Sequence, residues 1–175
     1  MDIKALKRAL RGEALARRDA LGERWRIEAS LAMADRAREI DLAPGDIVSG
    51  FWPMRSEVDV RPLMFALMER GARLVDMGFG TSGPGPEAAV LEPTLMLVPL
   101  AAFDDRGHRI GYGAGYYDRA IARLQAGPRP PRLIGIAFEC QRVERVPDQP
   151  HDIVIPEFLT ELGLRRLAPA PNPAP

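Results

Sequence analysis

Residues 94–125 read TLMLVPLAAFDDRGHRIGYGAGYYDRAIARLQ, and they contain the parts of one α/β unit. The apolar run 94–99 predicts a buried strand, and residues 116–125 have the spacing of an amphipathic helix. Between them, glycines at 111, 113 and 115 mark the turn into the helix. Glycine adopts backbone angles closed to other residues, and a helix start offers unpaired N–H groups. The unit therefore predicts a site for an anionic group such as phosphate.

Strands and helices alternate along the rest of the chain. The expected elements are helices over 2–20 and 23–40, a strand over 47–52, a helix from about 59 to 71, and strands over 72–75 and 132–138. This order predicts an α/β fold in three layers, with a largely parallel Rossmann-like sheet flanked by helices. In such folds ligands bind at the carboxyl ends of the strands.

Length and composition indicate one globular domain. We expect residues 1–167 to form it, with a Gly/Pro-rich loop over 77–93, and residues 168–175 to form a disordered Pro/Ala tail. Lys and Arg total 24, as do Asp and Glu, so no overall field favours nucleic acid or an anionic membrane. Any anion-binding site must therefore be local.

The compartment is predicted from two simple features. The single cysteine, Cys140, has no partner for an intramolecular disulfide and no zinc-ligand spacing around it. No apolar run approaches the roughly 20 residues that span a bilayer. We expect a cytoplasmic protein that is a monomer or a weak homo-oligomer.

Two charged residues flank the glycines. Arg109 can pair with phosphate oxygens, whereas Asp118, in the first turn of the helix, would repel them unless a cation such as Mg²⁺ lay between. A simpler alternative is a flexible glycine turn followed by an acidic residue that complements the helix dipole. The residues alone leave both readings open.

The wider segment resembles a known family signature. Residues 98–118 contain Val-Pro, Phe-Asp, Gly, Arg-aliphatic-Gly and Gly-x-Gly-Tyr-Tyr-Asp, in the order found in 5-formyltetrahydrofolate cyclo-ligases. The resemblance implies that ATP contacts Arg109, Ile110, Gly111, Tyr112, Gly113, Ala114, Gly115, Tyr116 and Tyr117. It implies that the folate substrate shares Tyr112, Gly113, Ala114, Gly115 and Tyr116, and that Asp118 binds Mg²⁺.

A basic helix near the N-terminus extends the resemblance. Lys7 and Arg11 lie four residues apart, so they share one helix face, where two like charges repel each other weakly. The spacing by itself favours a solvated basic face. In the family a Lys-Arg-x-x-Arg motif contacts ATP and substrate, which implies that role for Lys7, Arg8 and Arg11. We expect Lys7, Arg11, Arg109 and Tyr116 to be the catalytic residues.

The segment after the first predicted strand supplies candidate folate contacts. Trp52 can stack on a flat pterin ring, and Glu57 can accept hydrogen bonds from its N–H groups. Alternatively, Trp52 is a core aromatic and Glu57 a surface charge. The family has an acidic motif here whose glutamate binds folate, which implies that role for Glu57 and a supporting one for Trp52.

Residues 134–152 contain a Gly-aliphatic-Ala-Phe…Gln…Pro…His-Asp block like that of the family. The resemblance implies that Asp152 is a second metal ligand, although a His-Asp pair is more often a surface turn. His151 either orients that carboxylate or has no role.

One departure from the family pattern bears on function. After Val75 the sequence lacks the strand–turn–strand segment, containing Leu-Pro, Phe-Arg and Trp, that contributes folate contacts in the family. The resemblance implies ATP- and Mg²⁺-dependent cyclisation of 5-formyltetrahydrofolate to 5,10-methenyltetrahydrofolate, with release of ADP and phosphate. The alternative is a non-catalytic or substrate-altered nucleotide-binding relative that has lost folate recognition.

Overall fold

The computed structural model of the protein describes residues 2–76 and 91–167. Within these ranges the core is a six-stranded sheet with strand order β2-β1-β3-β6-β7-β8. The strands are β1 (Ile47–Gly50), β2 (Arg73–Asp76), β3 (Leu95–Pro99), β6 (Arg132–Ile136), β7 (Glu157–Thr160) and β8 (Gly163–Arg166). Neighbouring strands are parallel except β7 and β8, which are antiparallel. The prediction of a largely parallel sheet is confirmed.

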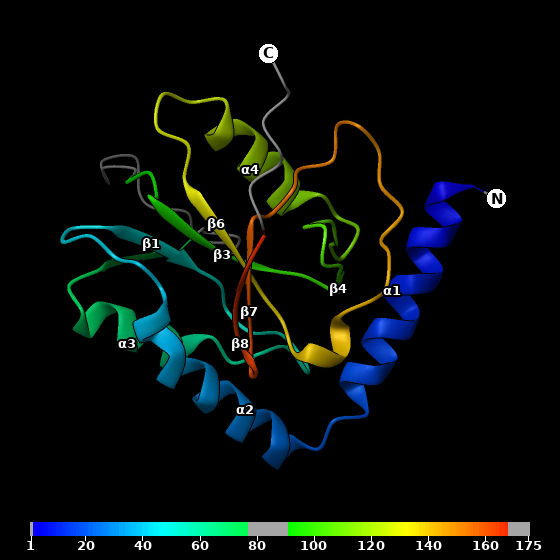
Figure 1. Ribbon diagram of the computed structural model, residues 1–175, viewed down its shortest axis with the longest axis horizontal. Helices are drawn as coiled ribbons and strands as arrows, with labels where there is room; N and C mark the ends of the chain where they lie inside the picture. Colours follow the sequence, from blue (N-terminus) through cyan, green and yellow to red (C-terminus); the bar gives the residue numbers. More distant parts are fainter. Residues whose placement is uncertain (1, 77–90, 168–175) are drawn as a thin grey trace.

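Helices cover both faces of the sheet, as Figure 1 shows. Helices α2 (Glu23–Asp35) and α3 (Arg61–Glu69) lie on one face, and α4 (Tyr116–Gln125) lies on the other. Strand β3 serves both layers because successive side chains point to opposite faces. Leu95 and Leu97 pack in the core beneath α2 and α3, whereas Met96 and Val98 pack with Ile121 of α4. The predicted three-layer architecture is confirmed.

Helix α1 (Ile3–Asp19) stands outside these layers (Figure 1). It begins at Asp2, whose carboxylate accepts a hydrogen bond from the Lys4 amide at 3.2 Å. Ala14 of α1 is buried against Ala102 and Ile110, which belong to a short antiparallel pair formed by β4 (Ala102–Phe103) and β5 (Arg109–Ile110). This packing fixes α1 beside the connection from β3 to α4.

The strand order reverses direction between β1 and β3. From β1 the chain proceeds to the β2 edge, whereas from β3 it proceeds toward β6. Open α/β sheets place ligands outside the carboxyl ends of strands at such a point. Phe51, directly after β1, and Pro99, at the end of β3, both line the large cavity described below.

Several element boundaries differ from the sequence predictions. The strand predicted over 47–52 ends at Gly50, and the helix predicted over 23–40 ends at Asp35, followed by the 3-10 helix η1 (Arg36–Glu39). Arg70 lies just beyond the end of α3, and its guanidinium donates hydrogen bonds to the carbonyls of Ala37 and Ile40. These carbonyls therefore need no helical partner.

The remaining boundaries shift by one to two residues or were not predicted. Helix α3 starts at Arg61, whose amide donates a hydrogen bond to the Asp59 carboxylate. Strand β6 ends at Ile136, two residues earlier than predicted. Strands β4, β5, β7 and β8 were not predicted. The loop predicted over 77–93 falls mostly, and the tail over 168–175 entirely, outside the described residues. Among the described residues, no helix is long and apolar enough to cross a membrane.

Candidate active site

A single cavity of about 1210 Å³ opens at the carboxyl ends of β1 and β3. Its walls come from α1, the loop after β1, the glycine loop with the start of α4, and residues 151–153. The predicted site residues that line it are Lys7, Arg11, Trp52, Glu57, Arg109, Ile110, Gly111, Tyr112, Gly113, Ala114, Gly115, Tyr116, Tyr117, Asp118 and Asp152. Segments distant in sequence are thus brought to one cavity.

Arg8 is the predicted residue that does not join this wall. It is exposed on α1 and is absent from the cavity lining, although Lys7 and Arg11 of the same motif are present. The reason is helical geometry: residues four apart share a face, whereas adjacent residues point about 100° apart.

The glycine loop has the backbone that its sequence requires. Gly113 has φ +99° and Gly115 has φ +73°, both in the left-handed region that glycine favours. Gly115 is the N-cap of α4, and no side chain caps this helix. Within the described residues, the N–H groups of Gly113 and Ala114 have no hydrogen-bond partner. Such amides at the positive end of a helix suit phosphate oxygens.

Two cations on α1 line the cavity, and one of them contacts this loop. The Arg11 Nε donates to the carbonyl oxygen of Gly111 at 2.8 Å, and its guanidinium lies 3.6–3.7 Å from the position a Gly113 Cβ would take. Lys7 Nζ donates to the Asp152 carboxylate at 2.8 Å. These contacts relieve the repulsion expected from two like charges one turn apart, and they keep both cations on the cavity wall.

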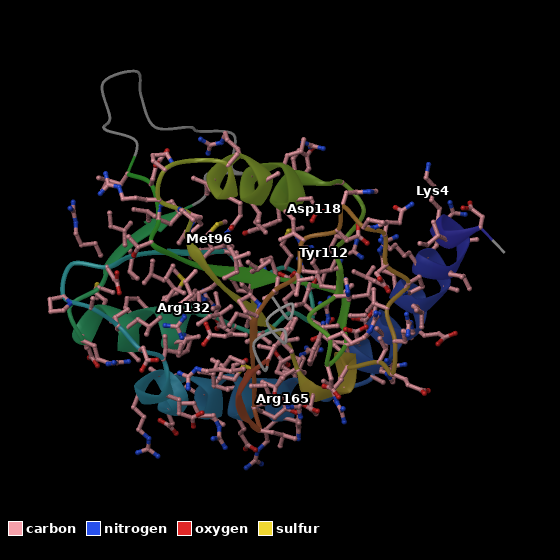
Figure 2. All side chains as sticks on the ribbon, turned by 45° about the horizontal axis from the view of Figure 1, so that its top comes forward. Lys4, Met96, Tyr112, Asp118, Arg132 and Arg165 are labelled. Carbon is pink, nitrogen blue, oxygen red and sulfur yellow. The ribbon has the colours of Figure 1, made fainter. Side chains whose placement is uncertain are left out.

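The two predicted metal ligands, Asp118 and Asp152, open on the same cavity. Figure 2 shows Asp118 at the start of α4. Asp118 is 61% exposed and forms an ion pair with Arg109, whose own side chain is only 5% exposed. The described residues contain no cluster of three or more His, Cys, Asp or Glu side chains suited to a metal. Asp118 and Asp152 each lie beside a cation instead, Arg109 and Lys7 respectively.

The environment of Asp152 keeps it ionised. Partial burial raises the pKa of its carboxyl, but the hydrogen bonds from Lys7 and from the Gln149 amide outweigh this and leave the pKa below its usual value. His151 is 77% exposed, and its Nε2 lies 3.9 Å from Asp152, so it adds a weak contact at most.

The loop after β1 presents Trp52 and Glu57 to the cavity. Trp52 is 72% exposed, and the Arg61 guanidinium lies over its ring at 5.1 Å, so Trp52 is not a core aromatic. Glu57 accepts from the Met54 amide at 2.8 Å and donates its own N–H to the Met54 carbonyl at 3.1 Å. Arg55, within this tight turn, has φ +53°.

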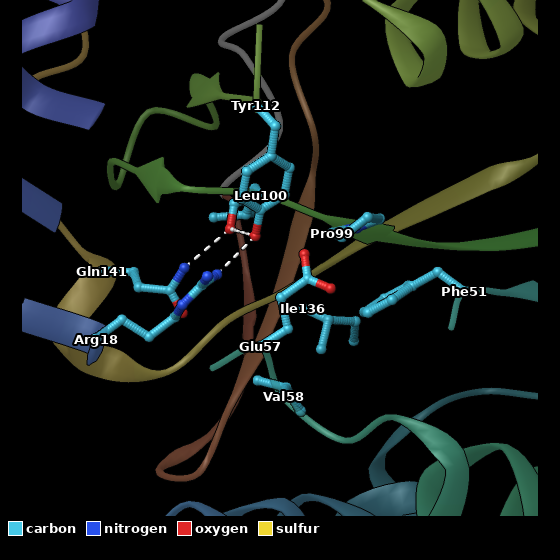
Figure 3. A pocket seen from close by; sticks show the side chains of 9 residues that line it. All are labelled: Arg18, Phe51, Glu57, Val58, Pro99, Leu100, Tyr112, Ile136 and Gln141. Atoms are coloured by element: carbon cyan, nitrogen blue, oxygen red, sulfur yellow. Dashed lines mark hydrogen bonds between the residues drawn. The ribbon is translucent and has the colours of Figure 1, made fainter. Parts of the chain in front are cut away.

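Sequence reasoning missed a polar group at the floor of the cavity. Figure 3 shows a small hollow lined by Arg18, Phe51, Glu57, Val58, Pro99, Leu100, Tyr112, Ile136 and Gln141. The Leu100 carbonyl accepts from Tyr112 Oη at 3.1 Å and from Gln141 Nε2 at 2.8 Å. Burial and the charge of Glu57 raise the pKa of the Tyr112 phenol, against the opposing effect of Arg18. The Tyr112 phenol therefore stays protonated and donates its hydrogen bond to the Leu100 carbonyl.

Among the site residues that sequence reasoning missed, Arg18 is the one that a sequence pattern could have indicated. It lies seven residues after Arg11, two helical turns along the face that carries Lys7 and Arg11. This spacing could have extended the basic stripe to a third cation. The contacts of Ser56 and Gln141 depend on tertiary packing and had no such signal.

The chain is similar to known proteins in sequence and in fold. The sequence model of the 5-formyltetrahydrofolate cyclo-ligase family matches residues 80–161. The cyclo-ligase of Mycolicibacterium smegmatis is 27% identical over 146 residues, covering 66% of this chain and 74% of its own. The solved structure of Aquifex aeolicus 5,10-methenyltetrahydrofolate synthetase superposes with a TM-score of 0.71 at 25% identity, over 97% of this chain and 96% of that one. The chain is thus similar to 5-formyltetrahydrofolate cyclo-ligases in sequence and to methenyltetrahydrofolate synthetases in fold.

Further 5-formyltetrahydrofolate cyclo-ligases match over shorter segments. The Escherichia coli K12 enzyme is 39% identical over 66 residues, which are 38% of this chain and 35% of that protein. The chain thus aligns with about a third of the length of this relative. The 5,10-methenyltetrahydrofolate synthetase structure from Mycoplasma pneumoniae has a TM-score of 0.71 at 23% identity and supports the same fold.

Proposed function

We propose that the protein catalyses the ATP-dependent cyclisation of 5-formyltetrahydrofolate to 5,10-methenyltetrahydrofolate, releasing ADP and phosphate. One observation carries the proposal: a single cavity joins the α1 cations, the glycine loop, the two aspartates and the Trp52/Glu57 loop. Its volume of about 1210 Å³ exceeds the ~300–1,000 Å³ of pockets for one small ligand. Two substrates that must react with each other need such a shared space.

The chemistry requires an exchange of leaving groups. The formyl oxygen accepts the γ-phosphoryl group of ATP, N10 attacks the formyl carbon, and phosphate leaves with the former formyl oxygen. Phosphate is a far better leaving group than an amide oxygen. Because phosphoryl transfer is catalysed mainly by positioning and charge neutralisation, the cations around the glycine loop are the expected contributors.

Each cation has a place in this scheme. Lys7 and Arg11 approach from α1, and Arg109 approaches from the end of β5. The Nε of Arg109 is buried and has no hydrogen-bond partner among residues 2–76 and 91–167, which leaves a donor for a phosphate oxygen. The unbonded amides of Gly113 and Ala114 add two more donors at the start of α4. Tyr116 lies on the same wall.

The carboxylates fit a Mg²⁺ ion carried with the nucleotide. Mg²⁺ is commonly bound by one or two carboxylates together with substrate phosphates, and Asp118 and Asp152 supply two on one cavity. When bound, the ion would neutralise phosphate charge. Asp118 and Asp152 would hold it, and their present partners Arg109 and Lys7 would then be released toward phosphate.

The folate side of the cavity is assigned to the loop after β1. The exposed ring of Trp52 offers a stacking face, and the Glu57 carboxylate points into the hollow in Figure 3, where it can accept N–H groups of a pterin. The sequence difference after Val75 falls on residues 77–90, outside the described part of the chain. Folate recognition is therefore the part of the proposal that most needs a direct test.

The experiment follows methenyl absorbance after mixing the protein with 5-formyltetrahydrofolate, ATP and MgCl₂. We expect product that requires all three components. Lys7→Met should raise the KM for ATP about tenfold or more, which corresponds to one lost charge-assisted contact of about 1.5–3 kcal/mol. Lys4→Met is the matched control, because Lys4 lies on the same helix, is exposed, and does not line the cavity.

Two outcomes would contradict the proposal in different ways. ATP binding without any product would favour the non-catalytic nucleotide-binding alternative. Product formation that is unaffected by Lys7→Met would instead remove the assigned nucleotide site.

A further inference from the structure

Arg18 is a buried cation whose hydrogen-bond partners are both hydroxyl groups, and its guanidinium also lies over the Tyr112 ring, 5.7 Å from the centroid. Only 4% of the residue is exposed, yet it lines both the large cavity and the hollow at its floor. Its Nε donates to Ser56 Oγ at 2.9 Å and its Nη1 donates to Tyr112 Oη at 2.6 Å. Its guanidinium forms no ion pair with a carboxylate in the ranges 2–76 and 91–167. Burying a charge in this way is costly, so the arrangement calls for a function.

The two hydroxyls are themselves fixed in orientation. Ser56 Oγ donates its proton to the Asp19 carboxylate, and Tyr112 Oη donates its proton to the Leu100 carbonyl. Each hydroxyl therefore turns a lone pair toward Arg18. A dashed line in Figure 3 marks the hydrogen bond between Arg18 and Tyr112. The hydrogen bonds from Arg18 to Ser56 and to Tyr112 therefore each have a fixed direction as well as a short distance.

These contacts join two loops that belong to different halves of the cavity. Ser56 precedes Glu57, the carboxylate assigned to the folate substrate, whereas Tyr112 lies within the glycine loop assigned to ATP. Arg18 itself lies on α1, so one side chain connects three segments. Arginine suits this task because its planar fork holds two acceptors at once, whereas a lysine ammonium is a single point on a flexible stem.

We propose that Arg18 is a positioning residue that holds the Glu57 loop and the glycine loop in a fixed relation across the cavity. The inference rests on the proposed function, since it gives the two loops their substrates. Arg18 acts through Ser56 and Tyr112 and needs no contact of its own with the reacting atoms. Its loss should therefore affect the rate of the joint reaction more than the binding of ATP alone.

The kinetic test compares Arg18→Lys with Arg17→Lys. In Arg18→Lys we expect kcat to fall by roughly tenfold or more, because small misplacements of reacting groups are costly, while the KM for ATP changes less than about twofold. Arg17 is the adjacent control: it is exposed, donates to the Cys140 carbonyl at 2.8 Å, and does not line the cavity. Rates are normalised to the folded fraction measured by circular dichroism.

A second measurement does not depend on catalysis. In ¹H–¹⁵N spectra without ligands, Arg18→Lys should shift the amide signals of both 54–58 and 111–115, and Ser56→Ala should shift mainly those of 54–58. Ser56→Ala also serves if Arg18→Lys does not fold. If the wild type lacks cyclo-ligase activity but these shifts appear, the proposed function fails and the connection between the loops stands.

Three results would overturn the inference. They are wild-type kcat in Arg18→Lys, a loss explained fully by unfolding, or amide shifts confined to α1. A Ser56→Ala spectrum unchanged over 54–58 would equally contradict it.

Discussion

At the scale of single residues, the site depends on charges that neutralise one another until a ligand arrives. Asp118 pairs with Arg109, and Asp152 pairs with Lys7, all on one cavity wall. Because Asp118 is 61% exposed and Asp152 is 25% exposed, solvent screens both pairs and each contributes little to stability. The same groups would therefore be available to the proposed nucleotide and metal ion.

Asp118→Asn tests the metal role of this residue. We expect turnover to fall, and to fall more at low than at high MgCl₂ concentration, because a weaker ligand set is compensated by more ion. The measurement is the methenyl formation rate across a MgCl₂ titration. An equal loss at every concentration would mean that Asp118 acts on Arg109 rather than on the ion.

At the scale of elements, β7 is held between its neighbours by charge as well as by the sheet. Glu157, at the start of β7, accepts from Arg132 of β6 at 2.6 Å and from Arg166 of β8 at 3.0 Å. Burial raises the pKa of the Glu157 carboxyl, but the hydrogen bonds and charges of Arg132 and Arg166 outweigh it and keep the pKa below its usual value. The ion pairs thus join three strands at one end.

This arrangement predicts a pH-dependent stability. Because the folded-state pKa of Glu157 is lowered, its contribution is complete above the unfolded-state pKa of about 4.3 and is lost as the pH falls through the lower folded value. Glu157→Gln should therefore reduce the free energy of unfolding by about 2 kcal/mol at pH 7.

Chemical denaturation of wild type and Glu157→Gln over a pH series measures this difference. It should shrink toward zero below the usual carboxyl range, since a protonated glutamate resembles glutamine. A difference that is independent of pH would show that packing of the side chain, and not its charge, is responsible.

At the scale of the whole molecule, the cavity is assembled by α1 closing against the sheet. Helix α1 lies outside the three layers, and its Ala14 is buried against the β4–β5 pair. The same helix carries Lys7 to Asp152, Arg11 to the glycine loop, and Arg18 to both the glycine loop and the loop after β1. A nucleotide that contacts both α1 and the loop should therefore stabilise the fold as a unit.

Nucleotide binding should be visible in thermal unfolding. A non-hydrolysable ATP analogue with MgCl₂, at about 100 times its Kd, should stabilise the protein by about 2.7 kcal/mol and raise the Tm by roughly 5 °C or more. Arg11→Met should lose most of this shift. Arg8→Met should keep it, because Arg8 is exposed away from the cavity wall.

Differential scanning fluorimetry of the two variants distinguishes the members of the basic motif. Equal losses in Arg8→Met and Arg11→Met would mean that α1 changes its orientation when the nucleotide binds.

The sequence by itself predicted the strand–glycine–helix unit and the residues around it, because local rules govern them. Apolar runs and helical spacing placed β3 and α4, and glycines at 113 and 115 stand where the backbone has positive φ. The contacts of Arg18 with Ser56 and Tyr112, by contrast, exist only because α1 packs beside both loops, although the spacing of Arg18 from Arg11 is visible in the sequence. The four short strands also escaped prediction, since two to four residues carry little periodicity. Contacts between distant segments depend on how elements pack, which no local pattern encodes.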